Sequence, residues 1–289
     1  MKIKVSLLSL SVLIAGLAVA QEKPPNMPPK VLVVTREFVK PGRAGTAHEK
    51  TESAFVQALS NSKWPTHYLA VDSLSGRPRS LFLTAFDSFE AWEKDTLAVQ
   101  KNPALSASLD RAALSDGDLL TDIDGGAFAY REEFSLRPGA DIPHMRYFEI
   151  SRFHIKPGHD KDWERLVKMV VGAYEKIPDV QWASYEGVYG VPDGTFLFFT
   201  PRKSASEVDR AFAQGKQFET IMGEGGMKQM RELSAETIES SETNLFVFNP
   251  RMSYVSEEWT KADPEFWTVK PVIAMGHPKK KGEAEAAKK

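Results

Sequence analysis

The chain has 289 residues, of which 42% are hydrophobic and 26% are charged, and its formal net charge is −2 at pH 7. This charge balance argues against nucleic-acid binding, which needs a basic face to neutralise phosphates. The chain has no cysteine, which excludes disulfides, thiolate catalysis, iron–sulfur clusters and thiolate metal sites. A chain of this length can build a core large enough to hold the fold without disulfides.

The N-terminal residues have the pattern of a secretory signal. Residues 1–20 combine Lys2 and Lys4 with an apolar run and end in Ala18-Val19-Ala20, a small-x-small cleavage site. The apolar run is too short to span a membrane. We therefore expect export to the periplasm or the outside of the cell, with no stable membrane anchor after cleavage. Residues 21–30 are rich in proline and are predicted to form an extended leader.

One stretch of sequence occurs twice. Val39-Lys40-Pro41-Gly42 returns 116 positions later as Ile155-Lys156-Pro157-Gly158, and residues 81–84 fall on residues 197–200 at the same offset. Self-similarity of this kind predicts two copies of one structural unit. We place the first copy at residues 31–135 and the second at residues 145–256.

Each copy is predicted to begin with a strand, at residues 31–39 and 146–155, which ends at the repeated Lys-Pro-Gly turn. A helix follows in each copy. In the second copy one face of this helix is apolar at helical spacing: Trp163, Leu166, Val167, Val170, Val171 and Tyr174. In the first copy the corresponding stripe is weaker: Ala47, Thr51, Ala54, Phe55 and Ala58, with Leu59 beside it.

Two further strands, a second helix and a last strand complete each copy. The paired strands are expected at residues 66–73 and 80–86, and at residues 181–189 and 195–200. The second helix is expected to begin at Ser88 and at Ser204, where Ser204 and Glu207 have the spacing of a capping box. The glycine-rich residues 223–226 are predicted to form a loop. The last strands are expected at residues 127–134 and 244–248.

The order strand–helix–strand–strand–helix–strand is the ferredoxin-like arrangement, in which helices cover one face of the sheet. The other face must be buried, and the sheet of the second copy is the simplest cover. We therefore predict an α+β protein in which tandem ferredoxin-like βαββαβ repeats form an intramolecular dimeric α/β-barrel. The chain is expected to be a monomer with an internal pseudo-dimer.

This element order, with the Lys-Pro-Gly turn and the serine before the second helix, resembles the dimeric α/β-barrel superfamily. Its members include antibiotic-biosynthesis-type monooxygenases, NIPSNAP-like proteins and stress-responsive barrel domains, and residues 149–158 resemble the opening strand of NIPSNAP-like sequences. The resemblance implies a tandem pseudo-dimer. It does not carry a function, because the superfamily hosts oxygenases, heme enzymes, isomerases and proteins of no known activity.

Six histidines are present, and no two of them have a metal-ligand spacing such as i, i+4 on a helix. The sequence also lacks a phosphate-binding glycine loop, a nucleophile elbow and a dinucleotide fingerprint. These observations predict neither a metal site nor a cofactor.

Several polar and aromatic residues are candidates for ligand binding. Arg152 and His154 share one face of their strand, and Arg36 occupies the position in the first copy that matches Arg152. If that face is turned into the barrel, the arginines would form an anion-binding arrangement. The alternative is that they are strand-edge charges at the surface. Trp182 and Tyr185 could line a flat ligand pocket or could simply belong to the core.

The predicted function is binding of a small apolar or aromatic molecule between the two sheets. The first alternative is a cofactor-independent monooxygenase or a related small-molecule oxidoreductase, for which His67, His154, Tyr185 and Glu149 are the candidate catalytic residues. No spacing in the sequence fixes any two of these four together. The second alternative is a structural or interaction module.

The C-terminal segment, residues 257–289, has an aromatic part and a basic tail. Trp259, Phe266 and Trp267 make residues 257–269 too aromatic for a free tail, so we expect them to pack on the domain or to cap one barrel mouth. A partner-binding patch is the alternative. The remaining residues, rich in lysine, glutamate and alanine, are predicted to be disordered.

Overall fold

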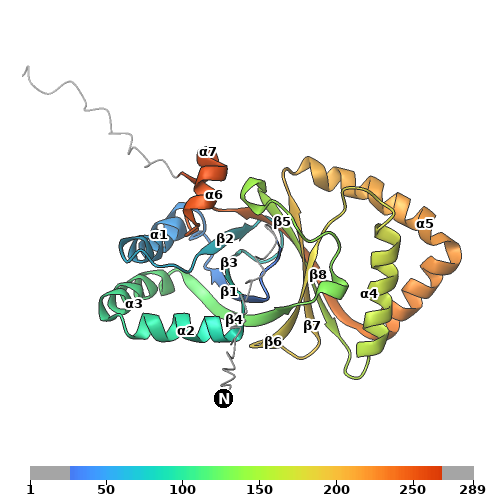
Figure 1. The fold of residues 1–289 in the computed structure, drawn as a ribbon, viewed down its shortest axis with the longest axis horizontal. Coiled ribbons are helices and arrows are strands. Elements are labelled where there is room, and N and C mark those ends of the chain that lie inside the picture. The colour runs from blue at the N-terminus through green and yellow to red at the C-terminus, as the bar shows by residue number, and fades with distance from the viewer. Residues whose placement is uncertain (1–26, 269–289) are drawn as a thin grey trace, which may run out of the picture.

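The computed structural model describes residues 27–268, so the predicted signal, most of the proline-rich leader and the basic tail lie outside the described residues. Within this range eight antiparallel strands close into a barrel in the order β1-β3-β2-β8-β5-β7-β6-β4 (Figure 1). The strands of the first half are β1 (Val31–Val39), β2 (Tyr68–Ser73), β3 (Arg79–Phe86) and β4 (Leu120–Tyr130). Those of the second half are β5 (Tyr147–Ile155), β6 (Ala183–Tyr189), β7 (Thr195–Arg202) and β8 (Ile238–Phe248). The mixed α+β barrel predicted from the sequence is therefore observed.

Each half contributes one continuous sheet to the barrel. The strands are hydrogen-bonded in the order β4-β1-β3-β2 in the first half and β8-β5-β7-β6 in the second. Two strand pairs join the two sheets. Strand β2 pairs with β8, where Val71 lies opposite Phe248, and β4 pairs with β6, where Tyr130 lies opposite Tyr185. These seams are short, at Val71–Ser73 of β2 and at Ala127–Tyr130 of β4, and they close the barrel.

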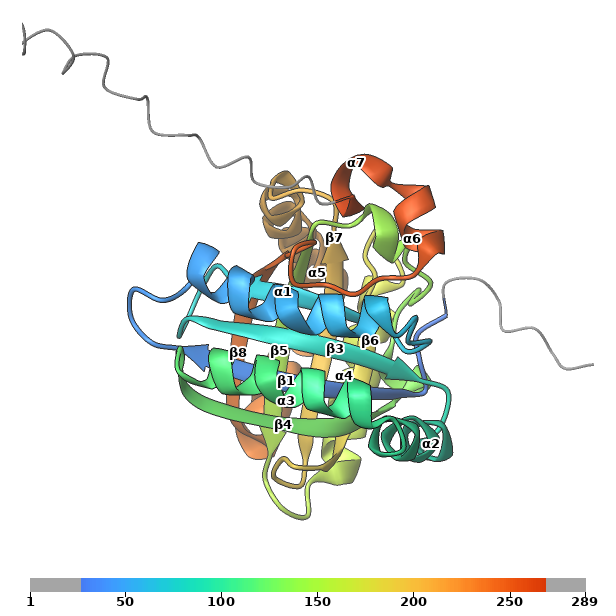
Figure 2. The same cartoon turned by 90° about the vertical axis from the view of Figure 1, so that its left-hand side faces the viewer.

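Helices cover the outside of the barrel on two opposite sides (Figures 1 and 2). The first half carries α1 (Thr46–Asn61), α2 (Phe89–Gln100) and α3 (Pro103–Gly117), and the second half carries α4 (Asp160–Tyr174) and α5 (Ser206–Thr237). The short 3₁₀ helices η1 (Glu132–Phe134) and η2 (Ile142–His144) lie in the connection between the halves. No helix between residues 27 and 268 is long and apolar enough to cross a membrane.

The barrel interior is filled by apolar side chains from both sheets. Alternate residues of each strand point inward, as the two-residue period of a strand requires. The largest buried cluster therefore draws on both halves, including Val34, Val71, Phe128, Ile150, Phe199 and Phe246. The faces of the sheets that point outward pack instead against the helices, and separate apolar clusters form there.

The aromatic C-terminal segment packs back on the barrel as α6 (Glu257–Ala262) and α7 (Pro264–Trp267). Trp267 is 5% exposed, and its indole nitrogen donates a hydrogen bond to the carbonyl of Pro143 at 2.9 Å. Its ring lies 6.4 Å from that of Phe248, at the end of β8. This segment thus connects the last strand to the linker between the halves.

Strands β4 and β8 begin well before their predicted starts at residues 127 and 244. The start of β4 is rich in aspartate and glycine, which are uncommon in strands, so its sequence hid the strand. Pairing with β1 overrides this preference, since Val39 lies opposite Leu120 at the far end of the ladder. Glycine is required at position 125, because a Cβ there would lie 2.6 Å from the carbonyl oxygen of Val34.

Two predictions for the second helices were wrong. Ser204 does not cap α5: its hydroxyl lies 2.7 Å from that of Ser206, and the Glu207 carboxylate accepts from the backbone N–H of Lys203 instead. By contrast, Ser88 caps α2 through the N–H of Ala91 at 3.1 Å. Residues 223–226 are not a loop, since within α5 only Gly223 leaves helical geometry, with φ 62° and ψ 176°. A glycine tolerates this conformation, so the helix kinks there and continues.

Candidate functional site

Helix α1 turns a polar pair toward the barrel. His48 and Glu52 are four residues apart and therefore lie on one face of the helix. Both are buried, together with Ala58 and Leu59. Of the apolar stripe expected on this helix, only Ala58 and the adjoining Leu59 are buried, so most of the predicted face was wrong. The stripe was weak because this helix buries ionisable side chains where α4 buries apolar ones.

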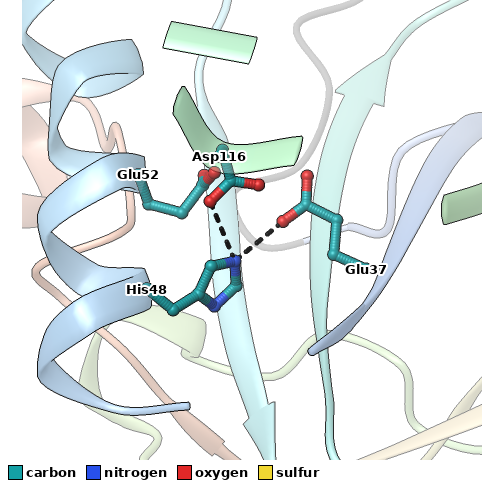
Figure 3. A group of neighbouring side chains, drawn as sticks. All are labelled: Glu37, His48, Glu52 and Asp116. Atoms are coloured by element: carbon teal, nitrogen blue, oxygen red, sulfur yellow. Dashed lines mark hydrogen bonds and ion pairs between the residues drawn. The ribbon is translucent and has the colours of Figure 1, made fainter. Parts of the chain in front are cut away.

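Four buried side chains meet between α1, α3 and the first sheet, and we name them the histidine–carboxylate cluster: Glu37, His48, Glu52 and Asp116 (Figure 3). His48 Nε2 lies 3.0 Å from Glu37 Oε2 and 3.5 Å from Asp116 Oδ1. One nitrogen or oxygen from each of the four lies within 4.8 Å of the others. The four residues are between 2% and 7% exposed, so the cluster is closed to solvent.

A ring of hydrogen bonds surrounds the cluster. Ser80 Oγ lies 3.4 Å from His48 Nδ1 and donates to Asp72 Oδ1 at 2.5 Å. Asn249 donates to the other oxygen of Asp72 at 2.7 Å. Thr51 donates to Asp116 Oδ1 at 2.6 Å. These contacts orient the imidazole ring and one carboxylate of the cluster.

The electrostatics of the cluster are unfavourable for its carboxylates. Burial raises the pKa of Glu52 to about 10, and repulsion from Glu37, Asp116 and Asp72 adds to the effect. Burial likewise raises the pKa of Glu37, although the hydrogen bond from His48 opposes the shift. For His48 burial acts to lower the pKa, but the hydrogen bond to Glu37 and the charges of the nearby carboxylates outweigh it, and the pKa is raised.

Sequence reasoning missed this cluster because it compared histidines only with one another. His48 and Glu52 do have the i, i+4 spacing of two ligands on a helix, and that signal was available. Glu37 and Asp116 come from other elements and are brought in by the fold. Imidazole nitrogen and carboxylate oxygen are ligands of divalent metal ions. The arrangement can therefore either share protons or hold a cation.

A cavity of about 360 Å³ lies between the outer face of the second sheet and helices α4 and α5, and we call it the helix–sheet cavity. Aromatic side chains form much of its wall: Phe153, Trp163, Tyr174, Trp182 and Phe198. The amphipathic pattern of α4 explains its position, because the apolar face of that helix is turned toward the sheet and buries Trp163, Leu166 and Val167.

The polar groups of the helix–sheet cavity are few. Glu149 accepts two hydrogen bonds from Arg202, from Nε at 3.1 Å and from a terminal nitrogen at 2.7 Å. Trp163 is 3% exposed, and its indole nitrogen has no hydrogen-bond partner within residues 27–268. Burial and the charge of Glu149 raise the pKa of Tyr174, which keeps its hydroxyl protonated near neutral pH. Trp163, a residue of the cavity wall, therefore carries a buried donor that no described group satisfies.

Two further cavities lie at opposite ends of the barrel interior. The mouth cavity, about 450 Å³, lies at the end lined by Leu32 and Phe148, and Pro29 and Trp259 also contribute to its wall. At the other end a space of about 40 Å³ is lined by three arginines, Arg36, Arg79 and Arg152. The interior between the two is packed with apolar side chains.

The structure brings Arg36 and Arg152 to the same end of the barrel, on the inward face. Arg36 is paired with Asp124 through two contacts of 2.5 and 2.7 Å. Burial lowers the pKa of Arg79, Glu242 opposes this, and the nearby Arg36 and Arg152 reinforce it. The structure thus shows which face of β5 is turned into the barrel. Arg152 lies on that face, and Glu149 lies on the opposite face, toward α4 and α5.

The other predicted site residues are spread over the molecule. Trp182 and Tyr185 both line the mouth cavity, and Trp182 also reaches the helix–sheet cavity. His67 stacks on Tyr254 with ring centroids 4.8 Å apart. His154 Nε2 lies 3.0 Å from a carboxylate oxygen of Glu239. Of the four catalytic candidates His67, His154, Tyr185 and Glu149, only Tyr185 lines the mouth cavity and only Glu149 lines the helix–sheet cavity.

Solved structures share this fold at low sequence identity. A putative monooxygenase from Fusobacterium nucleatum is similar with a TM-score of 0.50 and 12% identity, covering 76% of this chain and 93% of that chain. An anthrone oxidase-like protein has a TM-score of 0.50 and 14% identity over 76% of this chain and 92% of that chain. A mutant chlorite dismutase from Candidatus Nitrospira defluvii has a TM-score of 0.47 and 11% identity, with 82% and 96% covered.

No family model matches the sequence, and no curated protein is significantly similar to it. At these identities the structural likeness speaks for the fold alone. The α+β barrel fold itself is shared with the putative monooxygenase and the anthrone oxidase-like protein. What this barrel does must therefore be argued from its own cavities and side chains.

Proposed function

We propose that the protein is a monooxygenase-like barrel that binds a small, flat aromatic molecule in the helix–sheet cavity. The observation that carries the proposal is an aromatic cavity whose wall includes Trp163, a residue whose buried indole nitrogen lacks a hydrogen-bond partner within the described residues. Buried donors are almost always satisfied, so one without a partner beside a cavity suggests that a ligand oxygen accepts from it. The volume of about 360 Å³ is within the range of small-molecule sites.

The walls and the polar groups of the cavity have different tasks in this proposal. The rings of Phe153 and Phe198 provide apolar surface for a flat molecule, and Trp163 packs against both, with centroids 5.3 and 6.0 Å away. The Glu149–Arg202 pair supplies charge at the same cavity. Such a combination of mostly apolar walls and a few polar groups fixes the orientation of a bound ligand.

The mouth cavity is the competing place for a ligand, and it is the one that corresponds to binding between the two sheets. It is larger, but its arginine is already engaged: Arg137 donates to the backbone carbonyls of Glu175, Ile177 and Val180 at 2.7 to 3.1 Å. Within the described residues, none of the side chains that line the mouth cavity has a buried polar atom without a partner, as Trp163 has in the helix–sheet cavity. We therefore place the aromatic molecule in the helix–sheet cavity.

Oxygenation is the reaction that we propose for a ligand with an acidic carbon. Glu149 is the only carboxylate in the cavity wall among the described residues, and it would accept the proton from that carbon. For anthrone, the net change would be anthrone plus O₂ giving anthraquinone plus water. The shared fold with an anthrone oxidase-like protein makes anthrone a suitable probe.

The test compares two matched substitutions in the full chain. Ala211→Phe fills the helix–sheet cavity and Ala183→Phe fills the mouth cavity. Binding of anthrone is measured under argon by fluorescence quenching, and turnover in air by an oxygen electrode. We expect Ala211→Phe to abolish both and Ala183→Phe to leave both unchanged. Loss of binding in Ala183→Phe alone would place the ligand between the sheets and contradict the proposal.

The duplication and the export of the chain also remain proposals. The same strand order in both halves supports tandem ferredoxin-like repeats. The resemblance of residues 149–158 to the opening strand of NIPSNAP-like sequences rests on the sequence alone. The signal pattern of residues 1–20 supports export and a periplasmic or secreted location. Mass spectrometry of the protein from a periplasmic extract should find Gln21 at the N-terminus. An intact Met1 on cytoplasmic protein would contradict export.

A further inference from the structure

The histidine–carboxylate cluster has more acidic groups than its one imidazole can balance. Three carboxylic groups surround a single imidazole, and within residues 27–268 no lysine or arginine forms an ion pair with Glu37, Glu52 or Asp116. Buried carboxylates are normally paired with a cation or coordinate a metal. The four residues are only 2% to 7% exposed, so bulk solvent does not reach the cluster to take this role.

The hydrogen bonds of His48 point to a cation on its Nε2 side. Ser80 gives its own proton to Asp72, so its oxygen is free to accept from the Nδ1–H of His48. In that tautomer the lone pair of Nε2 faces the oxygens of Glu37 and Asp116. Metal-binding histidines characteristically donate their other ring N–H to such an outer partner.

Glu52 supplies a second and independent observation. Glu52 is 3% exposed, and its Oε1 has no hydrogen-bond partner in the part of the chain that the structure describes. Figure 3 shows its carboxyl group turned toward His48 and Asp116. A buried carboxylate oxygen left without a donor at the centre of such a group is costly unless something binds to it.

We propose that Glu37, His48, Glu52 and Asp116 bind one divalent transition-metal ion of the Zn²⁺ type. A tetrahedral ion with bonds of about 2.0–2.1 Å separates its ligands by about 3.3 Å. The distances from His48 Nε2 to Glu37 and Asp116, 3.0 and 3.5 Å, bracket that value. Four protein ligands and no adjoining cavity are typical of a structural site. The ion would tie β1, α1 and α3 together.

The test uses the full untagged chain, stripped with chelator and dialysed. Zn²⁺ is titrated by calorimetry and Co²⁺ by its visible absorption. We expect saturation at one equivalent, and a rise in Tm of roughly 5–10 °C at 100-fold excess over Kd. Glu52→Gln and Asp116→Asn should each weaken binding by about 100-fold or more. Glu49→Gln, on the same helix but outside the cluster, is the matched control and should bind as the wild type does.

Two results would overturn the proposal. The first is that the metal-stripped wild-type chain takes up neither Zn²⁺ nor Co²⁺. This result does not depend on how any variant folds. The second is one-equivalent binding that survives in both Glu52→Gln and Asp116→Asn, because the ion would then lie elsewhere, such as at the exposed pairs His144–Asp141 or His159–Asp162.

Discussion

Replacing Glu52 by glutamine should change how the stability of the metal-free protein depends on pH. The raised pKa of about 10 means that the folded chain holds the Glu52 proton well above the ordinary value of 4.5. Its contribution to stability is therefore complete below pH 4.5 and is lost progressively as the pH rises toward 10. Glutamine has the same shape, is always neutral and removes this loss.

The size of the effect follows from the linkage between protons and folding. One proton contributes about 1.4 kcal/mol per pH unit, so the advantage of Glu52→Gln over the wild type should grow by up to roughly 3 kcal/mol between pH 5 and pH 7. Near pH 5 the free energies of unfolding of the two proteins should differ by less than about 1 kcal/mol, since both side chains are then neutral in the folded state.

The assay is urea unfolding in the presence of chelator at several pH values. Glu49→Gln is the control on the same helix, where the carboxylate is partly exposed near Arg251, and its stability should run parallel to that of the wild type. If the curves of Glu52→Gln and the wild type are also parallel from pH 5 to pH 7, the reasoning about the buried carboxyl is refuted.

Three further outcomes are expected. Trp163→Phe should weaken anthrone binding roughly 2- to 12-fold, the worth of one hydrogen bond, as measured by titration under argon; an unchanged Kd would remove the indole nitrogen from the site. Gly190→Ala should destabilise the fold by about 1–3 kcal/mol in urea unfolding, because φ is +76° and the new Cβ would lie 2.4 Å from the Gly125 carbonyl oxygen. The control Gly172→Ala has open space around the new Cβ and should not destabilise the fold. Equal effects of the two substitutions would contradict the close contact at Gly190. Residues 30–140 expressed alone should aggregate or form homodimers by size-exclusion chromatography, because the strand partners β6 and β8 are removed; a stable monomer would argue against the shared core.

The barrel could be predicted because its signals are local or periodic. The Lys-Pro-Gly sequence that occurs twice directly follows β1 and β5, and the apolar face of α4 follows helical spacing closely. Trp163, Leu166 and Val167 are buried where that spacing places them. The sequence also showed that Arg36 and Arg152 occupy matching positions, although only the structure could show that this face is turned inward.

The histidine–carboxylate cluster could not be predicted in full, because it depends on contacts between distant segments. Glu37 and Asp116 are far apart in the chain and belong to a strand and a helix that meet only in the fold. In the sequence, the positions of these two residues do not differ from those of ordinary surface carboxylates. The hidden start of β4 has a related cause, since the ladder with β1 overrides the low strand preference of aspartate and glycine.

A crystal structure of the protein grown with anthrone under argon tests the central claim most directly. We predict one molecule in the helix–sheet cavity, stacked among Phe153 and Phe198, with its oxygen within hydrogen-bond distance of Trp163 Nε1. Anthrone bound in the mouth cavity, or a helix–sheet cavity that stays empty of anthrone at saturating concentration, would contradict the account.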